Sequence, residues 1–224
     1  MKEFKMLDFQ RSSQSIREFL DKPLSKDAIN EILLDAQAAP SACNTQPWLT
    51  HIISGKKAKE LKEILKDKWA KGETKSDFIW DQTQFKDKLD ERLRNQYKFV
   101  YDDFGVTRED RQGRADIMIR NLEFYGAPHV AMLFMPSITD NVNVATDMGM
   151  YAQNFMLSCT ARGYGSIPQL VFAMFADTIR KELGVSDELK LLFGISFGYP
   201  NWEAQPNKNH LSRVPLSKSV TFHE

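Results

Sequence analysis

One stretch of nine residues constrains the fold more than any other part of the chain. Residues 128–136 read Pro-His-Val-Ala-Met-Leu-Phe-Met-Pro, a nearly unbroken apolar run with a proline at each end. A strand with one solvated face alternates apolar and polar residues, so a continuous run is typical of a strand that is buried on both faces. Residues 191–199 have the same character. We therefore expect a sheet with two strands that are buried on both faces.

The segments around these two strands have helical periodicity. Residues 141–162 predict a long helix that is apolar on most of its sides, which is typical of a central, buried helix. Ser25 and Pro40 mark the start and the end of an earlier helix, because Ser caps a helix N-terminus and Pro cannot continue one. Further helices are expected at 57–71, 107–125 and 177–183, and a further strand at 48–54. Interleaved helices and strands place the fold in the α+β or the α/β class, with helix dominant.

Residues 56–112 differ from the rest of the chain in composition. They are dense in Lys, Asp, Glu and Arg, with isolated aromatic side chains between the charges. A separate domain is one interpretation, but the apolar content is thin for an independent core. We therefore interpret 1–224 as a single domain with a helical excursion at about 69–112.

Composition and charge exclude several classes of function. The chain has 224 residues and carries 30 Lys and Arg against 30 Asp and Glu, so no net charge attracts nucleic acid or an acidic membrane. No apolar run is long enough to span a bilayer, and the first residues lack the apolar core of an export signal. The two cysteines and four histidines have no metal-ligand spacing, and neither a GxSxG elbow nor a P-loop is present. We expect a cytoplasmic protein with reduced cysteines, no metal, no nucleic-acid partner and no membrane contact.

Four polar stretches could carry chemistry, and each also has an ordinary structural interpretation. Residues 11–17 hold two guanidinium and three hydroxyl groups, which suit a phosphate but equally suit a solvated terminal segment. The loop 40–48 presents Ser, Asn and Gln side chains that could read a heteroaromatic ring or form Asx turns. The glycines of 163–170 could bring the backbone close to a ligand or make a plain helix-to-strand turn. Two cations in 207–215 could reach a phosphate or lie in solvent.

Several short motifs stand in a characteristic order along the chain. They are Ser15-Ile16-Arg17-Glu18-Phe19, then Ala39-Pro40-Ser41 with Asn44-Thr45-Gln46-Pro47-Trp48, the turn from Gly163 to Gln169, and Phe197-Gly198-Tyr199-Pro200 with Arg213 downstream. Together they resemble the FMN-dependent nitroreductase family over nearly the whole chain. Residues 108–111, 127–129 and 147–151 are similar to the branch of that family that reduces nitrobenzoate- and dinitroaniline-type aromatics.

The resemblance implies a fold, a reaction and a partner. The fold would be α+β, with a central, mostly antiparallel sheet of four or five strands flanked by helices, in an intertwined homodimer with FMN at its interface. NAD(P)H would pass a hydride to flavin N5, and a nitroaromatic or quinone-like acceptor would then be reduced in a ping-pong reaction with no catalytic acid or base. Two alternatives stay open. One is a flavin reductase, enone reductase or reductive dehalogenase on the same scaffold, and the other is a non-enzymatic FMN-binding protein.

Position by position, the resemblance assigns the phosphate end of FMN to cations and hydroxyl groups. Ser15 and Arg17 match the N-terminal contacts to the phosphate and the ribityl chain. The family usually carries an arginine two residues before this serine, where the chain has Ser13. We expect Arg11 or Lys208 to supply the missing positive charge.

The resemblance also assigns residues to the flavin ring and to the C-terminal part of the site. Ser41, Asn44 and Gln46 match a loop that reaches the flavin, usually from the partner subunit. The stretch along the flavin, where a backbone N–H faces N5, is matched by Pro168, Gln169 and Leu170. Arg213 matches a C-terminal arginine that binds the phosphate.

The aromatic side chains of the excursion have two interpretations. The segment 69–104 would form a lid over a bound flavin, and four of its rings could sandwich an aromatic acceptor: Trp80, Tyr97, Phe99 and Tyr101. Alternatively, these aromatic side chains anchor the excursion to the core.

Overall fold

The two apolar runs form the interior of one antiparallel sheet. The computed structural model describes residues 10–224, so the first nine residues, on which part of the export-signal prediction depends, lie outside the described residues. The strands are β1 (Leu49–Ser54), β2 (His129–Pro136), β3 (Gly165–Gln169) and β4 (Leu189–Gly198), in the order β1-β2-β4-β3. All three ladders are antiparallel, and β2 pairs with β4 from His129 opposite Phe197 to Pro136 opposite Leu189. This confirms the prediction of an α+β fold with a mostly antiparallel sheet.

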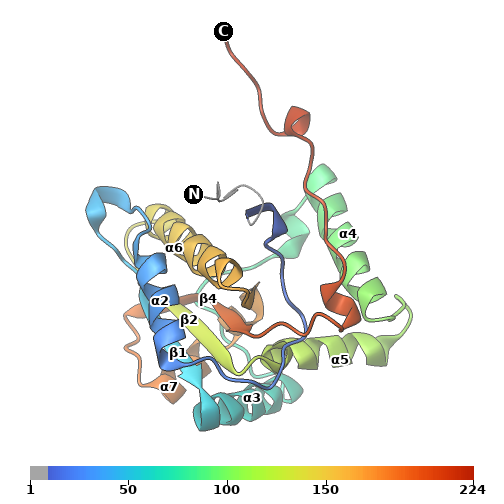
Figure 1. Ribbon diagram of the computed structural model, residues 1–224, viewed down its shortest axis with the longest axis horizontal. Helices are drawn as coiled ribbons and strands as arrows, with labels where there is room; N and C mark the ends of the chain where they lie inside the picture. The colour runs from blue at the N-terminus through green and yellow to red at the C-terminus, as the bar shows by residue number, and fades with distance from the viewer. Residues whose placement is uncertain (1–9) are drawn as a thin grey trace, which may run out of the picture.

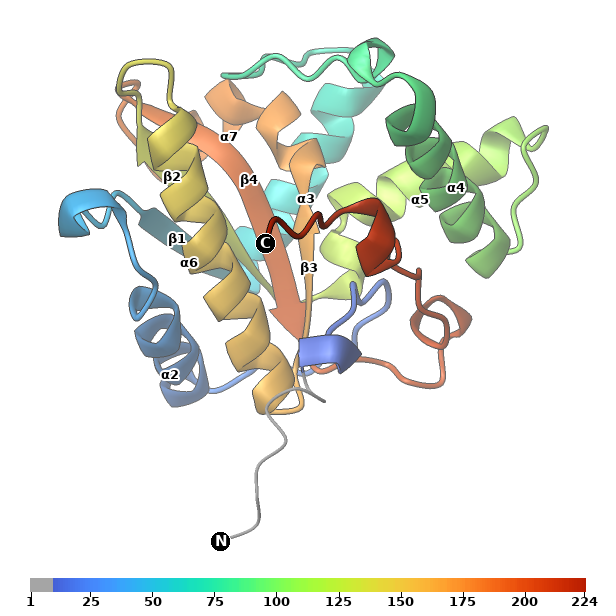
Figure 2. The same ribbon diagram turned by 90° about the horizontal axis from the view of Figure 1, so that it is seen from above.

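Helices cover both faces of the sheet (Figure 1). Their bounds are α2 (Lys26–Gln37), α3 (Gly55–Ala70), α4 (Asp87–Asp103), α5 (Arg111–Leu122), α6 (Val142–Ala161) and α7 (Ala176–Leu183). Apolar side chains of α2 and α6 pack on one face, and those of α3, α5 and α7 pack on the other. The predicted central helix is α6, which crosses one face of the sheet in Figure 2.

Strand β2 shows why both faces need helices. Seven of its eight residues are buried, as the apolar run predicts. Successive side chains of a strand point to opposite faces. Leu133 and Met135 therefore join the core under α2 and α6, while Met132 and Phe134 join the core under α3. A polar residue at any of these positions would be buried without a partner, so the continuous apolar run follows from the three-layer architecture.

Strand β3 was not expected from the sequence. The glycines of 163–170 predict a turn, yet residues 165–169 pair with β4 and place Pro168 opposite Ile195. Proline has no N–H for a ladder, but an edge strand leaves one side of the backbone without a ladder partner. The backbone N–H of Ile16 donates to the carbonyl of Ser166 at 3.1 Å, so the N-terminal segment lies against the outer edge of β3.

The helix expected at 107–125 is shorter, because its N-cap is Asp110 rather than Thr107. The carboxylate of Asp110 accepts the N–H of Gly113 at 2.8 Å, which satisfies one of the free donors of the first turn. Gly113 fits there because a Cβ would lie 2.4 Å from Asp110 Oδ2. Helix α5 therefore begins at Arg111, and residues 104–110 form an ordered connection from α4.

The excursion comprises the end of α3, the connection 71–86, α4 and the start of α5. Figure 2 shows α4 and α5 at one end of the molecule, opposite to α2 and β1. The tail after residue 207 runs beside α4, where Asn209 Nδ2 donates to Asp103 Oδ1 at 2.6 Å (Figure 1). That 1–224 form a single domain stays a prediction.

Three further observations concern membranes, metals and cysteines. Within residues 10–224, no helix combines the length and the apolarity that a bilayer crossing needs. The same residues hold no cluster of three or more His, Cys, Asp or Glu that could bind a metal ion. Cys43 is exposed and Cys159 is buried, and both are free thiols.

Candidate functional site

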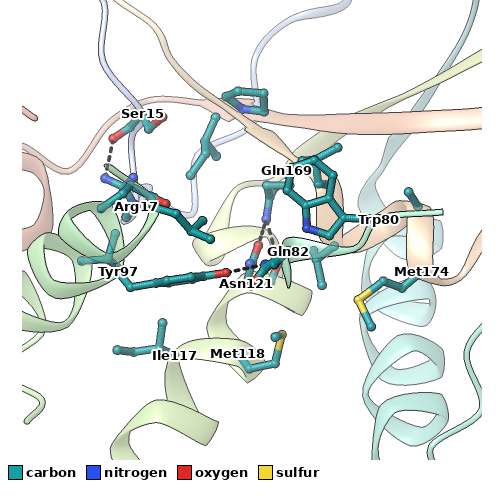
Figure 3. A pocket seen from close by; sticks show the side chains of 18 of the residues that line it. Ser15, Arg17, Trp80, Gln82, Tyr97, Ile117, Met118, Asn121, Gln169 and Met174 are labelled. Carbon is teal, nitrogen blue, oxygen red and sulfur yellow. Dashed lines mark hydrogen bonds between the residues drawn. The ribbon is translucent and has the colours of Figure 1, made fainter. Parts of the chain in front are cut away.

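A cavity of about 620 Å³ lies between the β3 edge of the sheet and the helices α4 and α5. Side chains from the N-terminal segment, the connection 71–86, both helices and the end of β3 converge on it (Figure 3). Of the residues assigned from the sequence, the lining contains Ser15, Arg17, Trp80, Tyr97, Tyr101, Pro168, Gln169 and Leu170. The first and the last of these residues, Ser15 and Leu170, are 155 positions apart in the chain.

The N-terminal segment is held at the cavity by its backbone. Ser15 forms a bridge with Ser166, and the N–H of Arg17 donates to Asn207 Oδ1 at 2.7 Å. Ile16 between them is buried against Gly165, where a Cβ would come within 2.7 Å of the isoleucine side chain. This anchoring leaves the side chains of Ser15 and Arg17 on the cavity side.

Arg17 brings a partly buried positive charge to the cavity. Burial lowers the pKa of Arg17 from its ordinary value, while Tyr125 and Asp103 oppose that shift. A guanidinium stays protonated at any physiological pH, so Arg17 remains a cation. Its Nη1 lies 3.5 Å from the carbonyl oxygen of Ser15, a long contact that leaves donors for a ligand.

The side chain of Gln169 is committed to the protein. Its Nε2 donates to the carbonyl and to Oδ1 of Asn121 at 2.8 and 2.6 Å, and its Oε1 accepts from Ser196. Only 3% of Gln169 is exposed. Its amide therefore fixes the end of β3 to α5 and has little capacity left for a ligand.

The residues on either side of Gln169 are open to the cavity. Pro168 and Leu170 are exposed, and Leu170 begins a short 3-10 helix. The first N–H groups of a helix have no partner within it. The chain thus offers backbone donors, beside two apolar side chains, to a flat ligand lying along 168–170.

An aromatic wall faces this strand end. The rings of Tyr97 and Tyr101 stack with centroids 6.2 Å apart, and Tyr97 accepts a hydrogen bond from Gln82 Nε2 at 2.6 Å. Trp80 packs edge-on against Phe85. In Figure 3, Ser15 and Arg17 lie toward one end of the cavity and Trp80 and Met174 toward the other. A planar aromatic ligand with an anionic tail suits such a space.

A family model described as the nitroreductase family matches residues 11–199 of this chain. The chain belongs to the nitroreductase family. The matched span includes every segment that lines the cavity.

Individual nitroreductases are similar over nearly the whole length. Nitroreductase NfnB of Mycolicibacterium smegmatis is 37% identical over 212 residues, which cover 95% of this chain and 90% of that protein. A 4-nitrobenzoate reductase of Pseudomonas putida is 31% identical over 90% of this chain and 88% of its own. The crystal structure of FMN-dependent NfnB from Mycobacterium smegmatis in complex with NADPH has a TM-score of 0.95 at 35% identity, and covers 98% of this chain and 99% of that one.

The loop assigned to the flavin lies elsewhere in this nitroreductase. Ser41, Asn44 and Gln46 precede β1, which is the opposite edge strand from β3. The loop is ordered by its own contacts, because Ser41 Oγ accepts the N–H of Gln46 at 3.0 Å and Asp147 accepts the N–H of Ala42. Within one chain these residues do not line the cavity.

Five other assigned residues also lie outside the lining. They are Arg11, Ser13, Phe99, Lys208 and Arg213. Arg213 is exposed, and its Nη1 donates to the carbonyl of Leu211 at 2.8 Å. Thr160 donates to Ser13 at 3.4 Å, which places Ser13 beside the end of α6.

Helix α5 contributes cavity residues that were not singled out from the sequence. Arg114, Met118 and Asn121 line the cavity at spacings of four and three, which is one face of a helix. That spacing is visible in the sequence, but nothing local distinguishes a helix face that meets a cavity from one that meets a core. Only the position of α5 against β3 identifies it.

Proposed function

We propose that this protein is an FMN-dependent oxidoreductase that uses NAD(P)H to reduce nitroaromatic or quinone-like acceptors. The observation that carries the proposal is the convergence of Arg17, the open strand end at 168–170 and the aromatic wall on one cavity. Relatives at 31–37% identity are named as a nitroreductase and a nitrobenzoate reductase, and the structure of one of them is described as FMN-dependent and bound to NADPH.

The residues present fit FMN. The cavity combines apolar walls, from Ile167 and Met118 among others, with the cation Arg17 and the hydroxyl of Ser15. A flavin has the matching character, because its ring is planar and largely apolar while its ribityl phosphate is anionic. Bound FMN would supply the acceptance and the donation of a hydride.

Each lining group has a defined task in this proposal. Arg17 would hold negative charge on the cofactor, and backbone donors at 168–170 would orient the ring edge. Tyr97 and Trp80 would cover the ring or an acceptor stacked on it and exclude water. No side chain is required to move a proton, so we assign no catalytic acid or base.

We propose that a second copy of the chain completes the site. The loop with Ser41, Asn44 and Gln46 does not line the cavity of its own chain, yet it is ordered and presents polar groups. In a dimer, the loop of each copy would face the cavity of the other. Large apolar side chains exposed on α2, β1, α6 and the tail supply surface for association: Leu34, Leu49, Val142, Leu216 and Phe222. In such a homodimer, Arg213, Lys208 or Arg11 would reach the phosphate.

We also propose a cytoplasmic location. Two free cysteines and balanced charge support it, since exported proteins commonly pair their cysteines.

Anaerobic spectroscopy tests the function. Purified protein should show the visible bands of oxidised flavin, lose them on addition of NADPH or NADH, and regain them when 4-nitrobenzoate is added. Protein that stays colourless after incubation with FMN would contradict the cofactor, and flavin that no nicotinamide bleaches would favour a binding protein without activity. A panel of nitroaromatic, quinone, enone, free-flavin and halophenol acceptors then separates the proposed activity from its alternatives.

A further inference from the structure

A second cavity, of about 880 Å³, lies on the other side of the aromatic wall, between α4 and the connection 105–108. Its lining is rich in positive charge, with four basic side chains and one acidic one. The basic residues are Arg94, Lys98, Arg108 and Arg114, and the acidic residue is Asp102.

Two of the four positive charges are already paired. Lys98 Nζ lies 2.6 Å from Asp102 Oδ2, and Arg94 Nη2 lies 2.9 Å from Asp90 Oδ2. Within residues 10–224, neither Arg108 nor Arg114 makes an ion pair, and Nε of Arg114 is buried without a hydrogen-bond partner. Nearby Asp110 is occupied by the first turn of α5. The second cavity therefore keeps two unpaired guanidinium groups, and leaving a buried donor unpaired costs free energy.

The second cavity adjoins the first one. Tyr97, Tyr101 and Arg114 line both. The stacked tyrosine rings thus form a shared wall, with Arg17 and the strand end on one side and Arg108 on the other. A ligand long enough to pass this wall could place a ring in the first cavity and an anionic group in the second.

NADPH has that form. It carries a nicotinamide ring at one end and an adenosine 2′-phosphate at the other, whereas NADH has a hydroxyl group in place of the phosphate. Arginine binds a phosphate through two parallel hydrogen bonds, and such charged bonds are stronger than neutral ones. An exposed tyrosine face beside the guanidinium groups suits the adenine ring.

We propose that Arg108 and Arg114 bind the adenosine 2′-phosphate of NADPH and make the protein prefer NADPH to NADH. This rests on the proposed function, because it assumes that a nicotinamide nucleotide enters the first cavity. The connection 105–108 and helix α5 would thus carry the residues that distinguish NADPH from NADH.

The first test measures binding without redox chemistry. Calorimetric titration of the FMN-loaded protein with adenosine 2′,5′-bisphosphate and with 5′-AMP isolates the 2′-phosphate. We expect the bisphosphate to bind roughly ten-fold or more tightly than 5′-AMP, and R108A to remove that difference. R92A is the matched control, since Arg92 is exposed on α4 and lines neither cavity. Equal binding of the two nucleotides, or an R108A variant that binds like the wild type, would overturn the proposal.

The second test follows flavin reduction anaerobically in a stopped-flow instrument. R108A should raise the apparent Kd for NADPH by roughly ten-fold, leave that for NADH within two-fold, and keep the limiting rate with either nucleotide. R114M should also raise the apparent Kd for NADPH, but Arg114 lines both cavities, so only R108A is expected to leave the reaction with NADH unchanged. Arg108 lies in an exposed connection, so its variant tests the idea even if R114M does not fold. Wild-type protein that uses both nucleotides equally well would refute the inference while the proposed function stands. Arg108-dependent binding of the bisphosphate without bleaching by either nucleotide would support the phosphate site and remove the proposed function.

Discussion

At the scale of single residues, charge and hydrogen-bond capacity separate groups that are free for a ligand from groups that the protein itself uses. Arg17 and Gln169 both line the first cavity and both were assigned to the cofactor. Arg17 keeps donors free, whereas the amide of Gln169 is bonded to Asn121 and Ser196. Their substitutions should therefore have different consequences.

Arg17→Gln should weaken FMN binding by roughly 10- to 100-fold, because a charged hydrogen bond contributes about 1.5–3 kcal/mol. Fluorescence titration of the flavin-free protein with FMN measures the effect. Arg17→Lys keeps the charge without the planar fork, so its affinity for FMN should lie between those of the wild type and Arg17→Gln. An unchanged Kd for FMN in Arg17→Gln would show that the phosphate and the ring are held by other groups.

Gln169→Leu should reduce the free energy of unfolding by about 1–3 kcal/mol, because Asn121 and Ser196 would lose their buried partner. Urea denaturation of the flavin-free protein measures the loss. Pro168→Ala is the control, since Pro168 is exposed beside it and should change stability by less than about 1 kcal/mol. Equal effects of the two substitutions would argue against a structural role of the Gln169 amide.

At the scale of elements, the start of α5 decides where Arg114, Met118 and Asn121 point. Asp110 caps the helix, and Gly113 makes room for its carboxylate. Helix propensity favours Ala over Gly by about 1 kcal/mol, so propensity alone predicts that Gly113→Ala stabilises the protein. The contact of 2.4 Å between the added Cβ and Asp110 Oδ2 predicts the opposite.

Gly113→Ala should therefore destabilise the protein by about 1–2 kcal/mol, through a displaced cap. A double-mutant cycle with Asp110→Ala distinguishes this cause from others. In the Asp110→Ala background the same change should cost clearly less, because the carboxylate is gone and only the close contact of 2.9 Å with Val106 Cγ2 remains. Additive effects in urea denaturation would contradict the steric explanation.

Another element-scale feature is the histidine that ties β2 to its neighbours. His129 Nε2 accepts the N–H of Leu24 at 2.8 Å, so this nitrogen carries no proton, and Nδ1 lies 2.6 Å from Ser54 Oγ. Burial lowers the pKa of His129. The folded protein keeps the imidazole of His129 neutral. As the pH falls below about 6.5, this histidine is therefore protonated in the unfolded chain at a higher pH than in the folded protein.

The stability contributed by neutral His129 should be complete above about pH 6.5 and decline as the pH drops toward the lowered pKa of the folded state. Urea midpoints at about pH 7.5 and 5.5 measure the decline. His129→Gln cannot take up the proton and should show a smaller decline than the wild type. Burial also lowers the pKa of His51, so part of the decline should remain until His51→Gln is added. The same decline in wild type and His129→Gln would exclude His129 as its source.

At the scale of the whole molecule, the cavity and the assigned loop lie at opposite ends of one chain. Figure 2 shows the segment around 42–44 beyond β1 and the cavity helices α4 and α5 on the other side. A twofold dimer could bring the loop of one copy to the cavity of the other. A chain with a damaged cavity and a chain with a damaged loop would then form one intact site when they pair.

Mixing two variants with weakened FMN binding tests this arrangement. Arg17→Gln damages the cavity of its own chain, and the double substitution N44A/Q46A damages the loop offered to the partner. After the subunits are exchanged, heterodimers should contain one intact site, which restores about one quarter of the wild-type sites. Nitroreductase activity with 4-nitrobenzoate, measured at an FMN concentration that saturates the wild type but neither variant, should rise on mixing above the sum of the two parents. No recovery between variants proven to exchange would contradict a shared site.

Much of the fold follows from the sequence alone. The apolar runs at 128–136 and 191–199 determined two strands buried on both faces, and the periodicity of 141–162 determined the central helix, because such patterns depend on neighbours a few positions apart. The sequence motifs also point to Ser15, Arg17 and Leu170, which line one cavity in the structure. The prediction that they share a site needed the family resemblance.

Tertiary structure alone decided β3, the commitment of Gln169 and the two faces of the aromatic wall. Strand β3 begins with Gly165, follows Gly163 closely and contains Pro168, so its local sequence does not favour a strand and only the pairing with β4 makes it one. Gln169 is used by Asn121 and Ser196, which lie 48 and 27 positions away in the chain. Arg108 and Arg114 look like ordinary surface charges in the sequence, and only the fold shows that no described acidic group pairs with them. Whether a side chain is free for a ligand depends on which distant groups satisfy it, and that is a property of the folded arrangement rather than of local sequence.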